Sequence, residues 1–140
     1  MPVQFHPKQG CVVVVDFSGG FKEPEMVKRR LAIVLSKPIR RRPNIMTVVP
    51  LSTLEPQHPM PYHLFLDLGF DLRGAWWREC WLNGDMVTSV AFHRVDLLRR
   101  KDSATGRRKY LDKPLDDFVF RDVQTAVMHG LGLSALTKHL

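Results

Sequence analysis

Short apolar runs, rich in β-branched residues and ended by Gly, Pro, Asn or Ser, recur along the chain before Arg99. Runs of this length predict buried β-strands, because they are too short for a buried helix. The first run ends in Ser18-Gly19-Gly20, and Asn83-Gly84 carries a tight-turn signal. We expect strands at residues 11–17, 31–36, 45–52, 62–66 and 81–82, with a further stretch at 85–88 after the turn.

The run at 45–52 contains Pro50. Proline has no N–H to donate to a sheet ladder, so this position favours an edge strand or a bulge over a central place in the sheet. Farther along the chain, residues 99–108 are polar and basic around Gly106, which predicts a hairpin loop.

Beyond that loop, apolar residues recur at helical spacing between residues 119 and 131, which predicts an amphipathic helix. Pro114 and Asp116 suit its start, and Gly130 or Gly132 suits its end. Several short antiparallel strands closed by one helix predict a mainly β (α+β) fold, a small β-barrel capped by the helix. Without repeats or linkers, residues 1–140 predict a single domain.

Charge narrows the choice of partners. The chain carries 21 Lys and Arg against 14 Asp and Glu, a formal net charge of +7. This balance favours an anionic partner, nucleic acid or an acidic membrane surface, although many small basic proteins bind neither. The apolar runs are too short to cross a bilayer, and the first residues have no apolar core of signal-peptide length. We therefore expect a cytoplasmic protein that does not enter a membrane.

Cysteine and histidine spacing gives no sign of a metal site. Cys11 and Cys80 stand far apart, and no CxxC occurs, so we expect reduced thiols within strands. The six histidines are scattered, with no pair at ligand spacing on a helix. The sequence therefore predicts no metal and no cofactor.

Segments spread over most of the chain carry a family pattern in a consistent order. They are an opening strand at 10–17, a segment at 24–36 in which Arg30 introduces the second strand, a third strand at 47–52 that ends in Ser52, a later strand and its exit at 84–90 and 94–97, and the helix end at 130–133. Together these segments resemble the PemK/MazF family of toxins. The order makes the match more specific than any one motif.

The resemblance implies an SH3-like antiparallel β-barrel and a homodimer. It also implies a type II toxin-antitoxin endoribonuclease that cleaves single-stranded RNA at specific sequences without a metal ion. In that reaction the ribose 2′-hydroxyl attacks the neighbouring phosphate. A cognate antitoxin that blocks the RNA groove is the implied protein partner.

Such a reaction needs a base for the 2′-hydroxyl, an acid for the departing 5′-oxygen and donors for the charge on the phosphorane. With the resemblance, Arg30 is expected to clamp the phosphate, because its planar fork can hold two oxygens and a guanidinium is hard to deprotonate. Ser52 keeps the hydroxyl of the family's Thr and can donate to a phosphate oxygen. The alternatives are a surface arginine and a turn serine.

Two carboxylates are candidates for proton transfer. Glu25 lies five residues before Arg30, on the loop that family members place over the RNA, and Asp85 matches an acidic family position. Either carboxylate can instead be an ion-pair partner of Arg29 or Lys28. His93 is a less favoured acid, for which a packing role is the stronger expectation.

Basic residues flank the second strand on both sides, which suits phosphate tracking along an RNA chain. The expected RNA-binding residues are Lys28, Arg29, Lys37, Arg40, Arg41 and Arg42. Phe21, Trp76 and Trp77 are candidates for stacking on bases, although adjacent tryptophans cannot both face one side of a strand.

Two other functions remain open. The same barrel can serve as a non-catalytic toxin that binds a protein, of the gyrase-poison type, or as an RNA-binding barrel without turnover. The combination of Arg30 and Ser52 favours the enzyme, because a pure protein binder has no need of both.

Overall fold

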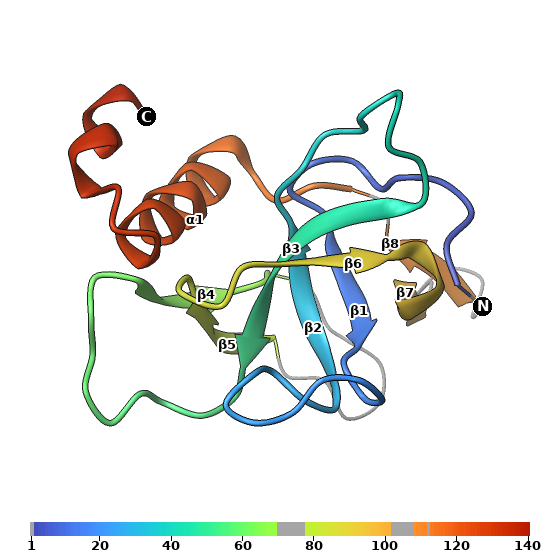
Figure 1. Cartoon of the computed structure of the whole chain (residues 1–140), viewed down its shortest axis with the longest axis horizontal. Coiled ribbons are helices and arrows are strands. Elements are labelled where there is room, and N and C mark those ends of the chain that lie inside the picture. The colour runs from blue at the N-terminus through green and yellow to red at the C-terminus, as the bar shows by residue number, and fades with distance from the viewer. Residues whose placement is uncertain (1, 70–77, 102–107, 112) are drawn as a thin grey trace.

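The computed structural model describes residues 2–69, 78–101, 108–111 and 113–140, which form a β-sheet and a C-terminal helix (Figure 1). The strands are β1 (Val12–Asp16), β2 (Arg29–Val34), β3 (Ile45–Ser52), β4 (His63–Asp67), β5 (Glu79–Asn83), β6 (Thr88–Ala91), β7 (Val95–Lys101) and β8 (Arg108–Leu111). The helices are α1 (Asp117–Gly130) and the 3-10 helices η1 (Phe92–Arg94) and η2 (Ser134–His139).

The strands pair antiparallel throughout. Their order is β4-β5-β3-β2-β1-β7-β8, and β6 also pairs with β3. No pairing in the described ranges joins β4 to β8, so the sheet is open at these two strands. The predicted mainly β fold with a C-terminal helix is confirmed.

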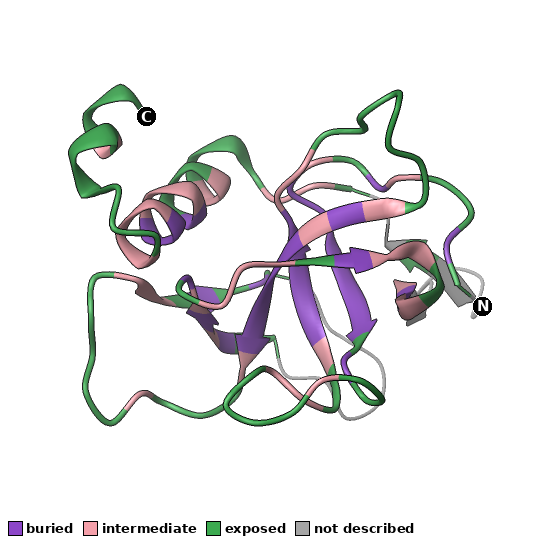
Figure 2. Ribbon diagram, viewed as in Figure 1, coloured by how far each residue is buried: buried purple, intermediate pink, exposed green. Residues whose placement is uncertain are grey.

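The central strands are buried on both faces (Figure 2). In β1, Val12 and Val14 belong to the cluster that packs under α1, whereas Val13 and Val15 belong to a second cluster on the opposite face. This alternation follows from the two-residue period of a strand. Helix α1 adds its buried stripe to the first cluster: Val123, Ala126 and Val127.

The predicted runs are strands, with shifts at their ends. β3 has the predicted bounds, whereas β2 starts and ends two residues earlier than the predicted 31–36. The basic loop predicted at 99–108 is the connection of the β7–β8 hairpin, although β7 continues into it as far as Lys101. The difference follows from the antiparallel pairing of these residues with β8, which continues to the pair Lys101 and Arg108 and which a local polar pattern does not reveal.

The expectation that Pro50 marks an edge or a bulge was wrong. β3 is a central strand, and Pro50 is buried opposite Ala32 of β2. On its other side β3 pairs with β6 up to Val48 and with β5 from Leu51 onward. Pro50 therefore lies where β3 changes neighbours, a break in the ladder at which a residue without N–H is tolerated.

Helix α1 packs closely on the turn that follows β5. A Cβ atom on Gly130 would lie 2.5 Å from the Gly84 carbonyl oxygen and 2.6 Å from the Asp85 nitrogen. A Cβ atom on Gly84 would lie 2.7 Å from the Ala126 carbonyl oxygen. Both positions need glycine because backbone meets backbone there, and this contact fixes the position of the Asp85 turn.

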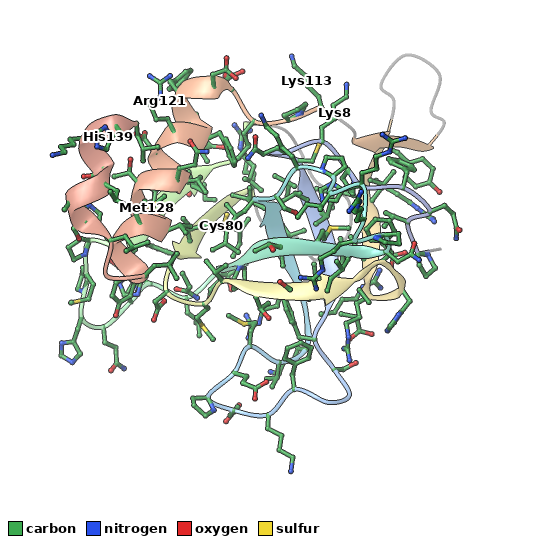
Figure 3. All side chains as sticks on the ribbon, turned by 45° about the horizontal axis from the view of Figure 1, so that its top comes forward. Lys8, Cys80, Lys113, Arg121, Met128 and His139 are labelled. Atoms are coloured by element: carbon green, nitrogen blue, oxygen red, sulfur yellow. The ribbon has the colours of Figure 1, made fainter. Side chains whose placement is uncertain are left out.

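Side chains divide clearly between interior and periphery. In Figure 3, Cys80 lies in the interior, while Lys8, Lys113, Arg121 and His139 project outward. Cys11 is also buried, and no disulfide joins the two cysteines. No helix in the described ranges is both long and apolar enough to span a membrane.

Candidate functional site

Arg30 and Ser52 meet where β2 begins and β3 ends. The register between these strands pairs Ala32 with Pro50, and Arg30 and Ser52 each lie two residues beyond that pair, in the same register. Both line a hollow of about 70 Å³, here called the Arg30 hollow. Its other lining residues are Arg29, Leu31, Leu51, Thr53 and Cys80. The structure thus brings the predicted clamp and the predicted hydroxyl donor together.

Two consecutive arginines at this point have different surroundings. The Arg30 Nε donates to the Val27 carbonyl at 3.1 Å, and in the described part of the chain its two terminal nitrogens have no partner. Arg29 points to the opposite face, where its Nη2 lies 3.1 Å from the Asp96 carboxylate. Arg30 is therefore the arginine whose fork is available to a ligand.

Ser52 is partly buried at the end of β3. Its Oγ accepts a hydrogen bond from the Leu54 N–H at 3.2 Å, as in a serine turn. Accepting this bond leaves the hydroxyl hydrogen free to donate to a ligand oxygen. The turn role and the donor role of Ser52 are thus compatible.

The two predicted proton carriers meet in a different place. Glu25 and Asp85 line a second hollow of about 450 Å³, here called the Glu25 hollow, between the loop at residues 17–28 and the turn after β5. Its walls are mostly apolar: Phe17, Phe21, Pro24, Met26, Met86, Val87 and Thr88. The predicted catalytic residues therefore fall into two pairs, each lining its own hollow.

Neither carboxylate has the ion-pair role considered from the sequence. In the described ranges the side chains of Glu25 and Asp85 make no hydrogen bond or ion pair, and Arg29 bonds to Asp96 instead. His93 is exposed in η1, so its expected packing role was wrong. A 3-10 turn on the surface, which the sequence pattern did not reveal, explains this exposure.

Arg94 holds the loop at residues 17–28 and was not singled out from the sequence. Its Nη1 donates to the carbonyls of Asp16 and Ser18 at 3.1 and 3.0 Å, and its Nη2 to that of Gly19 at 2.8 Å. Its guanidinium also lies 4.8 Å from the centre of the Phe21 ring. The only sequence signal was the family match at 94–97, which gave Arg94 no role.

Local hydrogen bonds complete the anchoring of this loop. The Ser18 hydroxyl and backbone N–H both donate to the Asp16 carboxylate, and they hold the pKa of Asp16 below its usual value. The Phe17 and Phe21 rings meet edge to face with centres 5.4 Å apart. The Phe17 N–H donates to the Lys28 carbonyl at 2.8 Å, which closes the base of the loop that carries Glu25.

The predicted RNA-binding residues lie at both ends of β2. Lys28 and Arg29 stand at its start, where Arg29 also lines the Arg30 hollow, and the remaining four follow its end in the connection to β3. All six are exposed: Lys28, Arg29, Lys37, Arg40, Arg41 and Arg42. Of the aromatic candidates, Phe21 lines the Glu25 hollow, and Trp76 and Trp77 lie outside the described residues.

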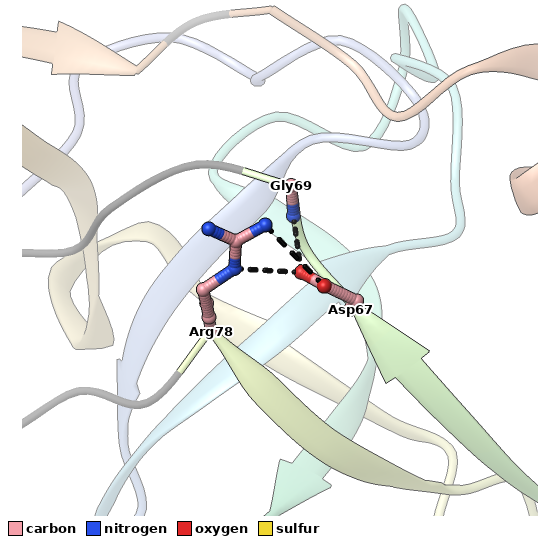
Figure 4. A network of polar contacts seen from close by, with 3 residues as sticks. All are labelled: Asp67, Gly69 and Arg78. Carbon is pink, nitrogen blue, oxygen red and sulfur yellow. Dashed lines mark hydrogen bonds and ion pairs between the residues drawn. The ribbon is translucent and has the colours of Figure 1, made fainter.

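An ion pair joins the two strands of the β4–β5 hairpin at the end where their connection begins (Figure 4). The Arg78 Nε and Nη2 donate to the Asp67 carboxylate at 2.9 and 3.3 Å, and the Gly69 N–H donates to it at 2.9 Å. The Arg78 bond and then the Gly69 bond lower the pKa of Asp67. Burial, with a smaller effect of the Asp67 charge, raises the pKa of the nearby Cys80 thiol to about 12.

In the described ranges no three His, Cys, Asp or Glu side chains come together as a metal-binding group. The absence of a metal requirement stays a prediction of the sequence.

The sequence of the chain is similar to a known protein family and to a protein of Escherichia coli. Residues 8–130 match the family described as PemK-like, MazF-like toxin of type II toxin-antitoxin system. The chain is 27% identical over 155 aligned positions to the uncharacterized protein YifN of Escherichia coli (strain K12), covering 97% of this chain and 99% of YifN.

Solved structures share the fold. An endoribonuclease in complex with its cognate antitoxin, from mycobacterial species, has a TM-score of 0.59 and 17% identity, with coverage of 91% of this chain and 97% of that one. MazF (Form-I) from Deinococcus radiodurans has a TM-score of 0.58 and 20% identity, with coverage of 92% and 99%.

Proposed function

The chain belongs to the PemK-like, MazF-like toxins of type II toxin-antitoxin systems, and we propose that it is a sequence-specific endoribonuclease that needs no metal ion. Its substrate is single-stranded RNA. The observation that carries this proposal is the Arg30 hollow, which is lined by both Ser52 and Arg30, an arginine whose two terminal nitrogens have no partner among the described residues.

In the proposed reaction the 2′-hydroxyl oxygen forms a bond to the adjacent phosphorus, and the bond from that phosphorus to the 5′-oxygen breaks. One proton leaves the 2′-hydroxyl and one reaches the departing 5′-oxygen, so the products are a 2′,3′-cyclic phosphate and a 5′-hydroxyl. Arg30 and Ser52 stabilise the charge that develops on the non-bridging oxygens. One charged donor placed in this way accelerates such a step by about 10²–10³.

Glu25 and Asp85 are the proposed proton carriers. Both carboxylates line one hollow and have no hydrogen-bonding partner among the described side chains, so both are available to a substrate. The loop that brings Glu25 to this hollow continues through Val27, whose carbonyl accepts from Arg30, so loop and clamp are mechanically linked.

The basic side chains at both ends of β2 supply attraction for the RNA backbone. Each neutralised phosphate releases counterions, so RNA binding should weaken as salt rises. Lys28 is an exposed cation directly before β2 and two residues before Arg30, and Lys37 with Arg40, Arg41 and Arg42 would contact phosphates farther along the strand.

Two protein partners belong to the proposal. A cognate antitoxin would cover the RNA site, as the family name implies for a toxin-antitoxin pair. A second copy of the chain would form a homodimer. We place the protein in the cytoplasm, where its RNA substrate is made.

Incubating the protein with a long single-stranded RNA, with and without EDTA, tests the proposal. We expect cleavage at a small set of sites in both conditions, products with 5′-hydroxyl and 2′,3′-cyclic phosphate ends, and no cleavage where a 2′-deoxyribose precedes the scissile phosphate. Cleavage that stops in EDTA and returns with a divalent metal contradicts the metal-independent reaction. RNA binding without cleavage favours the non-catalytic RNA-binding barrel, and neither binding nor cleavage favours the protein-binding toxin.

A further inference from the structure

Two aromatic side chains stand on the outer face of the β4–β5 hairpin. The ring centres of Phe65 and Trp81 are 5.4 Å apart, with the rings inclined at 64°. Phe65 is 51% exposed and Trp81 is partly buried. Their strand neighbours Leu66 and Cys80 face the core under α1, so the aromatic pair lies on the opposite side of the sheet from the helix.

Register places this aromatic pair next to the candidate catalytic residues. Trp81 pairs with Phe65 on one side and with Ser52 on the other, and Ser52 continues the β2–β3 register toward Arg30. Residues opposite one another in antiparallel strands point to the same face. Arg30, Ser52, Trp81 and Phe65 therefore form one row across β2, β3, β5 and β4, here called the cross-strand row.

The spacing of the row fits consecutive groups of an RNA chain. Neighbouring strands are about 5 Å apart, so Trp81 lies about 5 Å and Phe65 about 10 Å beyond Ser52. Apart from the aromatic rings, the same face carries polar side chains. Asn83 and His63 lie opposite each other on one flank of the rings, and the carboxylates of Asp67 and Glu79 on the other.

These flanks favour one orientation of a bound nucleotide. The carboxylates repel phosphate, and Asp67 is already engaged by Arg78, so a phosphate is favoured at Arg30 and Ser52 and not beside Glu79. An uncharged base can lie over the rings, because every base has a face that stacks on an aromatic side chain. The Asn83 amide offers hydrogen bonds to a base edge from the opposite flank.

We propose that Trp81 and Phe65 form a stacking site for the base of a nucleotide next to the phosphate held by Arg30 and Ser52. This inference rests on the proposed function, because the phosphate position comes from it. The two rings bind the base of the single-stranded substrate, and the cross-strand row sets the distance from that base to the scissile bond.

The test uses the full chain and a labelled RNA of about 12 nucleotides, within the usual size of single-strand sites. The RNA contains a cleavage site mapped with the unaltered protein and a 2′-deoxyribose that blocks cleavage. We expect Trp81→Ala and Phe65→Ala each to raise the Kd about 5- to 100-fold, the loss typical of one stacked base. Trp81→Phe, which keeps a ring, should recover most of the affinity.

Removing single bases from the RNA identifies the stacked nucleotide. An abasic residue at one position next to the cleavage site should weaken binding to the unaltered protein as much as Trp81→Ala does, and should cause no further loss in that variant. Phe5→Ala is the matched control, because this phenylalanine is 55% exposed and lies in the segment before β1, outside the cross-strand row. It should bind every RNA as the unaltered protein does.

The outcomes separate this inference from the proposed function. Cleavage by the unaltered protein, with intact RNA affinity in both alanine variants, overturns the stacking site and leaves the endoribonuclease standing. If the unaltered protein cleaves no RNA, the proposed function fails. The stacking site is then tested by comparing the Kd of the unaltered protein and of the two alanine variants for unmodified single-stranded RNA. If the variants lose a dimer or an antitoxin and keep RNA affinity, the face belongs to a protein and the inference is overturned. If Trp81→Ala does not fold, the RNA affinity of Phe65→Ala tests the stacking site instead. Phe65 is exposed, so its removal leaves the packing of the core intact.

Discussion

Arg29 and Arg30 are consecutive in β2 and point to opposite faces of the sheet. Arg29 alternates with Leu31 and Ile33, which pack under α1, and its guanidinium pairs with Asp96. Arg30 alternates with Ala32 and Val34 of the opposite cluster. An ion pair as exposed as that of Arg29 stabilises a protein by about 0–1 kcal/mol. It also reduces the charge that Arg29 can offer to a phosphate, so Lys28 is the stronger contributor at this end of β2.

Arg94 acts on the site through the loop that it holds. Because lysine cannot reproduce the fork that reaches three carbonyls, we expect Arg94→Lys to lower stability by about 1–2 kcal/mol. RNA cleavage should fall by about tenfold, since Glu25 then loses its fixed place. Denaturant unfolding and single-turnover cleavage measure the two effects. An Arg94→Lys variant with unaltered cleavage would show that the loop position does not matter to the reaction.

Cys80 gives the stability a dependence on alkaline pH. The thiol has a pKa of about 12 in the folded chain against 9.0 for an ordinary cysteine, so the unfolded chain loses this proton first. No stability is lost below pH 9, and between pH 9 and about 12 stability falls by up to about 1.4 kcal/mol per pH unit. Urea unfolding from pH 7.5 to 10.5, with a reductant, should show a shallower decline for Cys80→Ala. If the free energy of unfolding falls equally with pH in Cys80→Ala and in the unaltered protein, this role of Cys80 is refuted.

Among the elements, α1 and the turn after β5 depend most on each other. Gly84 and Gly130 allow their backbones to touch, and Asp85 follows Gly84 directly. The helix thus positions a proposed proton carrier although it lies on the far side of the sheet from the cross-strand row. The apolar stripe of α1 predicts the helix from sequence. The sequence identifies Gly130 only as a possible helix end and does not predict its contact with the turn after β5.

In Gly130→Ala, higher helix propensity and a steric clash with the turn after β5 have opposite effects on stability. Alanine stabilises a helix position by about 1 kcal/mol over glycine, whereas overpacking costs about 1–3 kcal/mol. Because the new Cβ would meet backbone at 2.5 Å, we expect net destabilisation and a displaced Asp85 turn with slower cleavage. Gln124→Ala, elsewhere on α1, is the control that should leave both properties nearly unchanged. A more stable Gly130→Ala variant would contradict the close packing.

Strands and helix were predictable because their signals are local. The β-branched runs gave β1 and β3 within one residue at each end, and the helical spacing gave α1. Pro50 misled because the partners of β3 change along its length, which only the assembled sheet reveals. The exposure of His93 was also not predictable, because it results from the short helix η1 between β6 and β7, which has no signal in the sequence.

The site was predictable only in part, for the same reason. The family pattern along the chain singles out Arg30 and Ser52, which the structure brings together. Trp81 appeared only as a strand residue and Phe65 within another strand. Their place beside Ser52 depends on the pairing of β5 with both β3 and β4. The sequence between these strands gives no indication of that register. Likewise, no sequence pattern pairs Arg94 with the carbonyls of a distant loop.

At the scale of the whole molecule, large apolar side chains are exposed along the C-terminal segment that contains α1 and η2. They are Phe118, Leu131, Leu133, Leu136 and Leu140. A surface of this kind on a small protein commonly marks an interface. We therefore place the contact of the proposed homodimer there.

Light scattering at micromolar protein should return the mass of a dimer. Leu136→Glu should give a monomer, because a charge in an apolar contact is costly to bury. Ile39→Glu is the matched control, since Ile39 is an exposed apolar residue in the connection between β2 and β3. It should remain a dimer. A monomeric unaltered protein, or a Leu136→Glu dimer, contradicts this interface.

The most direct test of the account compares Arg30→Ala with Arg29→Ala in single-turnover cleavage of RNA at saturating protein. Arg30→Ala should lower the cleavage rate by about 10²–10³ while the Kd changes little, because other cations keep the RNA bound. Arg29→Ala should cleave at nearly the unaltered rate, as should the exposed control Arg121→Ala on α1. If Arg29→Ala abolishes cleavage and Arg30→Ala does not, the reacting phosphate lies on the face toward α1. If neither slows cleavage, the Arg30 hollow is not the site of the reaction.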